Sequence, residues 1–391
     1  MAGICTRKGG NLMRGAFPDE PFTELRQGIR ALMERFPEAY WRKLDEEEAY
    51  PEAFVQAMTE AGYLAALIPE AYGGVGLGIR EASVILEEVH RAGGNAAACH
   101  AQMYILSALV RHGSEEQKAR YLPPLARGQL RLQAFGVTEP DAGSDTWSIR
   151  TFAERRGDRY VIYGQKIWTS RALYSDLMLL LARTKTGLTL FLANIRENLG
   201  RTVHIRPIRT MINHHTTEVF LDGLEVPVED RIGEEGEGFR YLLDGVNAER
   251  ILIAAECVGD AYYFLQKASD YARERRVFGR PIGQNQGIQF PLAQAYAHAR
   301  AADLMRWKAA ELYDQGLPCG PEANMAKLLA ADASWEAANA ALQTFGGFGF
   351  AKEFPIERKF RETRLYQVAP ISTNLILAYL GHKVLGLPKS Y

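Results

Sequence analysis

The sequence is poor in cysteine and has no long apolar run. Its cysteines form no CxxC pair, so neither a disulfide framework nor a zinc site is expected, and widely spaced thiols are typical of a reducing compartment. No apolar stretch approaches the roughly 18 residues of a membrane span. The net charge is −1, without the basic surplus of nucleic-acid-binding proteins. These absences favour a cytoplasmic protein with no nucleic-acid partner, no membrane span and no metal. The cysteines are Cys5, Cys99, Cys257 and Cys319.

Common cofactor and catalytic motifs are absent as well. The sequence has no GxGxxG after a strand, no GxxxxGK[ST], no HExxH and no GxSxG. Its eight histidines are scattered, and only His214 and His215 are adjacent, which is poor spacing for holding one metal ion. We interpret this pair as polar residues of a loop before a strand.

The hydrophobic pattern changes along the sequence. Its 391 residues are a length typical of two to three domains. Helical periodicity up to about Leu130 gives way to short β-branched and aromatic runs, and it returns at Gly236. The predicted fold class is therefore α+β. The predicted segments are a flexible N-terminus (1–20), a helical domain (21–131), a β domain (132–235) and a helical bundle (236–391).

The periodicity also predicts individual elements. Helices are expected in the first domain at 22–36, from about Pro51, at 79–92, at 95–112 and after the capping-box residue Ser114. Strands are expected at 160–163, 177–181, 188–193, 203–208 and 218–224. Bundle helices are expected at 239–273, 286–315, 322–344 and 372–385.

The longest predicted helix, 239–273, carries Glu249. Its apolar residues recur at a spacing of three and four. At about 100° per residue, Glu249 falls nearly opposite that stripe, close to Glu256 and Asp260. Two interpretations stay open at this point. The ordinary one is a solvated residue on a polar face, because Glu is rarely buried unpaired. The other is a catalytic base in a cleft that the polar face lines.

Three stretches could serve a ligand. Val137–Asp145 combines small residues, hydroxyls and free backbone N–H groups, which suit an anionic ligand or simply form a polar turn. Gly164–Ser170 ends a strand and contains Trp168, which either stacks on a planar ring or belongs to the core. Gln343–Phe350 has glycines that either admit a ligand or end a helix.

Together and in this order, these stretches resemble the acyl-CoA dehydrogenase family over nearly the whole chain, from about Phe22 to Leu387. The resemblance implies an N-terminal helical domain, a middle β-barrel domain and a C-terminal four-helix bundle. It also implies a homotetramer in which part of each FAD site comes from a neighbouring subunit. The matching pieces are Thr138–Asp145, Arg275–Gly279 with Gln286, Gln343–Gly349, and Glu218–Asp222 followed by Val226–Pro227.

Site residues follow from the same resemblance. The flavin ring is expected to meet Phe135, Val137, Thr138, Trp168 and Ser170, with Gly143 and Ser144 near flavin or CoA. The adenine and pyrophosphate end is expected to meet, across the subunit interface, Arg275, Phe278, Gln286, Gln343 and Gly347. Ser372 and Asn374 match later flavin contacts, and Ser144, Asn247 and Arg250 are expected substrate contacts.

The reaction implied is α,β-dehydrogenation of an acyl-CoA thioester to the trans-2-enoyl-CoA. A carboxylate removes the α proton, the β hydride passes to flavin N5, and the electrons go on to an electron-transfer flavoprotein. Many members carry the base near the C-terminus, where this chain has Pro370. A minority, including the isovaleryl-CoA and long-chain branches, carry it on the long helix in a Glu-Arg-Leu pattern. Glu249-Arg250-Ile251 matches that pattern, which makes Glu249 the expected base.

Pro370 has a second consequence. In the family the backbone N–H at this position helps to polarise the thioester carbonyl, and proline has no N–H. The flavin ribityl hydroxyl, the Ile371 N–H or a shifted backbone would have to replace it.

Two other functions stay open beside the dehydrogenase. One is an oxygen-using flavin oxidase or monooxygenase on the same fold, and the other is a non-catalytic interaction protein. For the dehydrogenase, a base on the long helix favours a branched or medium-to-long acyl group.

Overall fold

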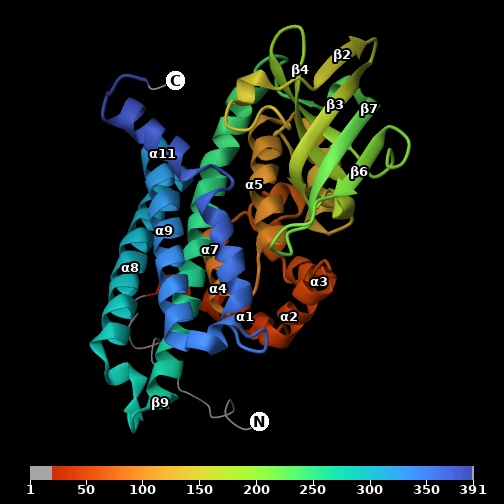
Figure 1. Ribbon diagram of the computed structural model, residues 1–391. Coiled ribbons are helices and arrows are strands. Elements are labelled where there is room, and N and C mark those ends of the chain that lie inside the picture. The colour runs from red at the N-terminus through yellow and green to blue at the C-terminus, as the bar shows by residue number, and fades with distance from the viewer. Residues whose placement is uncertain (1–19, 390–391) are drawn as a thin grey trace.

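The computed structural model describes residues 20–389, and the segment 1–19, most of the expected flexible N-terminus, lies outside them. The described part of the chain begins with a helical region (Figure 1). Its first helix buries Ile29, Leu32 and Met33, the apolar stripe that the helical spacing predicts. The helices are α1 (Thr23–Met33), α2 (Glu38–Glu46), α3 (Glu52–Glu60), α4 (Ile79–Arg91), α5 (Ala97–His112) and α6 (Glu115–Ala126).

A single eight-stranded sheet makes up the middle region. The hydrogen-bonded order is β6-β7-β3-β2-β4-β5-β8, with β1 pairing β4. The expected barrel is thus not closed by backbone pairing in the described residues, because β6 and β8 stand at opposite ends of this order. The strands are β1 (Leu132–Gly136), β2 (Phe152–Arg156), β3 (Arg159–Ser170), β4 (Leu177–Arg183), β5 (Leu188–Asn194), β6 (Val203–Pro207), β7 (Thr216–Pro227) and β8 (Arg231–Ile232).

The C-terminal region is again helical, and the three long helices lie close to their predicted positions. Within this C-terminal region, two features escaped prediction. One is the hairpin of two-residue strands that follows α7, and the other is α10, whose Arg358, Lys359 and Glu362 are buried. The elements are α7 (Gly238–Glu274), β9 (Arg276–Val277), β10 (Arg280–Pro281), α8 (Gln286–Asp314), α9 (Gly320–Phe345), α10 (Glu357–Arg364) and α11 (Thr373–Tyr379). The α+β fold class is confirmed.

Helix α7 is the central element of the molecule. It packs against α8 and α9 of the bundle and also against α4 and α5 of the N-terminal region, so every residue from Ile251 to Leu265 is buried. Helix α10 reinforces this packing, because Lys359 Nζ donates to the Gly94 carbonyl at 3.0 Å and pairs with Asp260 of α7 at 2.6 Å. The position of α7 therefore depends on helices from both ends of the chain.

Candidate active site

Glu249 lies inside this packed region and not on a solvated surface. Only 5% of its area is exposed, so the interpretation as a solvated acid is wrong. Helix α7 packs against α4 and α5 of the N-terminal region as well as against the bundle, and the Tyr104 hydroxyl of α5 hydrogen-bonds to the Glu249 carboxyl group. A helix that is buried on all sides carries few polar groups without a reason.

The surroundings of Glu249 disfavour its charged form. Burial raises the pKa of its carboxyl group to about 7, against the opposing effects of the Arg250 charge and of a hydrogen bond from the Tyr104 hydroxyl on α5. Arg250 itself donates from Nη1 to Asn247 Oδ1 at 2.9 Å. Its Nε has no hydrogen-bond partner among residues 20–389. A carboxyl group with a pKa near neutrality can both accept and release a proton at physiological pH.

Two further buried acids lie on α7, and both are paired. Glu256 accepts from His100 Nδ1 at 2.8 Å and from the Tyr366 hydroxyl at 2.9 Å. Burial alone would raise its pKa, but the facing His100 and His90 hold it at about 2. Asp260 pairs with Lys359 and with His90 Nδ1 at 2.8 Å. Both carboxyl groups are therefore held in place by partners within the core.

Val137–Asp145 forms the expected polar turn. Glu139 and Ala142 exchange two backbone hydrogen bonds of 3.1 Å. The buried Glu139 carboxylate accepts from the backbone N–H groups of Arg150 and Thr151. It also pairs with Lys166 Nζ at 2.8 Å. The buried Glu139 carboxylate therefore anchors the turn to the β domain, while Gly143 and Ser144 are exposed to solvent.

Trp168 is not a core residue. Its indole is 57% exposed at a backbone φ of 60°, which is an unfavourable conformation for a residue other than glycine. The Thr138 carbonyl accepts from the neighbouring Ile167 N–H at 2.9 Å. The turn and the end of β3, which Ser170 closes, therefore lie side by side.

Phe135 connects this part of the β domain to Glu249. Its ring meets the edge of Tyr104 with centroids 5.5 Å apart, and Tyr104 hydrogen-bonds to Glu249. One aromatic side chain of α5 thus touches both the candidate flavin wall and the candidate base. Tyr104 and its neighbour His100 were not predicted, because no local motif marks single polar residues in an alanine-rich helix.

The residues expected at the adenine end lie elsewhere in the chain's structure. The hairpin β9–β10 is at the lower end of the bundle, whereas the β domain stands beside its upper end (Figure 1). Phe278 of that hairpin is 100% exposed, and Arg275 stacks over the Phe348 ring at 5.7 Å. Gln286 begins α8, Gln343 lies in the last turn of α9, and Gly347 follows it.

The loop before α11 carries the remaining site residues. Ser372 Oγ caps α11 by accepting from the Leu375 N–H at 3.3 Å, and Asn374 is exposed. Pro370 is exposed in the same loop. Lys327 of α9, also missed from sequence, is fully buried and donates to the carbonyls of Tyr366 and Ile371.

Family models match all three regions of the chain. The acyl-CoA dehydrogenase N-terminal domain matches residues 19–129, the middle domain 134–224 and the C-terminal domain 236–370. The chain belongs to the acyl-CoA dehydrogenase family. It is 35% identical over 365 residues to acyl-CoA dehydrogenase fadE12 of Mycobacterium bovis, covering 90% of this chain and 93% of that one. Members of this family are flavoprotein oxidoreductases.

Two solved structures resemble the chain closely. Butyryl-CoA dehydrogenase of Megasphaera elsdenii is 28% identical with a TM-score of 0.88, over 94% of this chain and 100% of that one. A chain from a study of the electron transferring flavoprotein of Acidaminococcus fermentans is 29% identical with a TM-score of 0.85, over 94% and 99%. No helix among the described residues is long and apolar enough to cross a membrane.

The residues of the β domain fit a flavin. An exposed indole beside the hydroxyl-bearing Thr138 and Ser170 offers a planar face and hydrogen-bonding groups for a polar ring edge. The Thr169 hydroxyl oxygen is buried without a hydrogen-bond partner within residues 20–389. At the other end, no atom of the described residues lies within 4 Å of the position that a Cβ atom would take at Gly346 or Gly347, so a ligand can approach the backbone there.

Proposed function

We propose that the chain catalyses FAD-dependent α,β-dehydrogenation of an acyl-CoA thioester, with Glu249 as the base. The observation that carries this proposal is the burial of Glu249, which gives its carboxyl group a pKa of about 7. A general base works best when its pKa lies near the operating pH.

In this reaction the α C–H and β C–H bonds break and a carbon–carbon double bond forms. Glu249 takes the α proton, and FAD, when bound, accepts the β hydride. The carboxylate of Glu249 is held by Tyr104 and flanked by Arg250. A precisely positioned base is needed because an α C–H group is a weak acid and small displacements cost large factors in rate.

The flavin ring would lie against Phe135, Val137, Thr138, Trp168 and Ser170, with Gly143 and Ser144 at its edge. Residues at the lower bundle end would hold the adenine and pyrophosphate of a neighbouring subunit's FAD, in a homotetramer. The fully exposed Phe278 supports this assignment, because an exposed phenylalanine in an otherwise folded hairpin is typical of an interface. We further propose that an electron-transfer flavoprotein accepts the electrons.

Asn247, Arg250 and Ser144 are proposed substrate contacts, while Pro370 leaves the loop before α11 without one backbone donor. Lys327 fixes this loop through the carbonyl groups of Tyr366 and Ile371. The loop is therefore held beside α9, and we assign the Ile371 N–H as the replacement donor for the thioester carbonyl.

The test is anaerobic bleaching of the flavin by a panel of acyl-CoAs, in the wild type and in Glu249→Gln. We expect the variant to keep its FAD and to be reduced about 1,000-fold more slowly, as for loss of a general base. Glu274→Gln, which changes an exposed acid on the same helix, is the matched control and should behave as the wild type.

A Glu249→Gln variant that binds FAD and is reduced at the wild-type rate would contradict the proposal. Rapid oxygen consumption by the reduced wild type would instead indicate the oxidase alternative. Protein that stays colourless with added FAD would indicate a non-catalytic role.

A further inference from the structure

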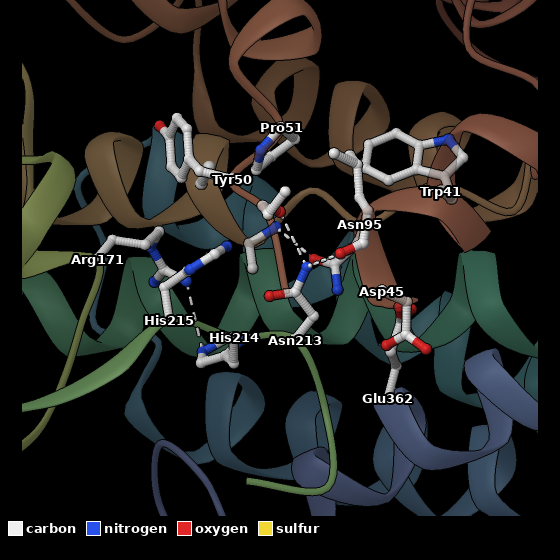
Figure 2. Close-up of a pocket in the computed structure, with 14 residues that line it drawn as sticks. Trp41, Asp45, Tyr50, Pro51, Asn95, Arg171, Asn213, His214, His215 and Glu362 are labelled. Atoms are coloured by element: carbon white, nitrogen blue, oxygen red, sulfur yellow. Dashed lines mark hydrogen bonds between the residues drawn. The ribbon is translucent and has the colours of Figure 1, made fainter. Parts of the chain in front are cut away.

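A small cavity lies where the N-terminal helices meet the β domain. Its walls come from α2 and the segment that follows it, from the start of α5, from Arg171 directly after β3, from the loop before β7, and from Glu362 of α10. Figure 2 shows Tyr50, Arg171, His214 and His215 on one side and Asp45 with Glu362 on the other. About 30 Å³ is open to water-sized atoms, which is room for about two of them.

Arg171 is a buried cation that has no counter-ion in the described part of the chain. Its exposed fraction is 5%, and no carboxylate oxygen lies within 4.0 Å of its guanidinium among residues 20–389. Its one side-chain hydrogen bond there is a long one, 3.4 Å between Nη1 and His214 Nε2, and its Nε has no partner. An uncompensated buried charge is strongly destabilising.

The acids that line the cavity or lie near Arg171 already have partners. Asp45 pairs with Arg361 at 2.6 Å, and Glu362 pairs with Arg358 at 2.7 Å. Glu256 is close enough for its charge to be felt at Arg171, but its two oxygens accept from His100 and Tyr366. The cavity therefore has a cationic side that the described residues do not neutralise.

Two residues on the cationic side of the cavity have strained backbone conformations. Arg171 and His215 both adopt the left-handed region, with φ of 59° and 51°, and the Arg171 N–H donates to the His215 carbonyl at 2.8 Å. Such conformations in residues other than glycine tend to cluster at ligand sites. His215 Nε2 is a second buried nitrogen without a partner in the described part of the chain.

We propose that this cavity binds a carboxylate group, with Arg171 as its counter-ion, and that the carboxylate is the far end of the substrate's acyl group. The inference rests on the proposed function. A carboxylate presents two oxygens, which match both the available space and the fork of a guanidinium. A whole flavin ring or acyl chain does not fit this space.

Helix α5 connects the cavity to the base. Ala97 and Ala98 line the cavity, and Tyr104, which hydrogen-bonds to Glu249, lies nearly two helical turns further on, about 10 Å away at roughly 1.5 Å per residue. An acyl group running along α5 from Glu249 would bring its far end to Arg171.

The first experiment compares matched acyl-CoAs on the FAD-loaded enzyme. The pairs are butyryl and glutaryl, hexanoyl and adipyl, and octanoyl and suberyl, each with and without a terminal carboxylate. We expect the wild type to have a higher kcat/KM for the carboxylate member of at least one pair. Arg171→Met should lower that preference about 100-fold, the size expected when one partner of a buried ion pair is lost. Arg171→Lys should retain part of it.

The controls separate this inference from the proposed function. Arg155→Met makes the same change at an exposed position of β2 and should leave the preference unchanged. If both members of every pair reduce the flavin equally well in the wild type, the carboxylate site is overturned while the dehydrogenase stands. If no acyl-CoA reduces the flavin, the proposed function fails. The second experiment then shows whether the cavity binds a carboxylate.

The second experiment measures thermal unfolding with free glutarate, adipate or inorganic phosphate. Arg171→Met should unfold at the same or a higher temperature than the wild type without ligand, because removing an unpaired buried charge does not destabilise. A dicarboxylate should stabilise only the wild type.

A lower unfolding temperature for Arg171→Met, or loss of its FAD, would overturn the inference by showing that Arg171 already has a partner. Stabilisation by phosphate alone would overturn the carboxylate assignment. Stabilisation by free dicarboxylates, with no preference among the acyl-CoAs, would overturn the assignment to the acyl group.

Discussion

Two glutamates on α7 lie seven residues apart and have opposite properties. Glu249 and Glu256 are both buried, yet the pKa of the first is raised to about 7 and that of the second is lowered to about 2. Burial acts in the same direction on both. The difference comes from their partners. Two imidazoles and a phenol face Glu256, whereas the charges of Arg250 and Lys327 and the hydrogen bond from Tyr104 offset only part of the effect of burial on Glu249.

The comparison shows that burial alone does not define a catalytic acid. A carboxylate surrounded by cationic and donor groups is stabilised as an anion and cannot hold a proton near pH 7. A buried carboxyl group with too few cationic or hydrogen-bond-donating partners retains its proton near pH 7, and its ionisation lowers the stability of the folded state. The helix thus carries one anion that stabilises the fold and one acid that is suited to proton transfer.

The largest expected contrast is in stability. Glu256→Gln should lower the free energy of unfolding by about 4 kcal/mol, because it leaves buried partners of an ion pair uncompensated. Glu249→Gln should leave this free energy unchanged or raise it. Denaturant unfolding of both variants at pH 7 measures the contrast, and equal losses in the two would show that Glu249 is also a fixed anion.

The second-largest expected effect is an opposite dependence of folding stability on pH for Glu249 and Glu256. Below pH 4.5 the Glu249 carboxyl group is protonated in both states. As pH rises from 4.5 to about 7 only the folded state retains the proton, so the wild type should lose about 3 kcal/mol relative to Glu249→Gln. For Glu256 the sign is reversed, and its contribution is lost as pH falls from 4.5 toward about 2. Unfolding curves across this range test both signs, and a difference that stays flat from pH 4.5 to 7 would refute the raised pKa.

A shorter side chain should weaken the base without removing it. Glu249→Asp withdraws the carboxylate by one methylene, and a displacement of about 1 Å costs about 100-fold in rate. Anaerobic flavin reduction by the preferred acyl-CoA measures this effect. The control is Glu256→Asp, which should be reduced at nearly the wild-type rate wherever it remains folded.

The smallest expected effect concerns the hydrogen bond from Tyr104 to Glu249. Tyr104→Phe removes a donor that lowers the pKa of Glu249. The half-maximal rate should therefore move to higher pH, with about a fivefold slower reduction at pH 7 from the loss of one hydrogen bond. A pH–rate profile that is scaled down without moving would show that Tyr104 acts only by packing.

Much of the fold could be predicted because its signals are local. The strand β7 contains its predicted range, and α8 begins at its predicted residue. Helix α10 was missed because it is short and highly polar, and its Lys359 is buried only through contacts with Gly94 and Asp260, far away in sequence. The interpretation of His214 and His215 as a loop before a strand is confirmed.

The site was predictable only in part. Family motifs pointed to Glu249 and Trp168, and the structure shows that neither is what its ordinary interpretation suggested. Tyr104, His100 and Arg171 carry no motif, and they matter because three regions of the chain meet around them. Their roles depend on distances that sequence spacing does not contain.

Tyr104 of α5 links three regions of the chain, since its ring contacts Phe135 of the sheet and its hydroxyl hydrogen-bonds to Glu249 of the bundle. Substitutions at these three positions should therefore not be independent. A change in any one of them alters the background in which the other two are selected. Changes to this site during evolution would then require coupled substitutions in separate domains. Exchange of a domain between relatives would disturb the surroundings of Glu249 even when each domain folds well.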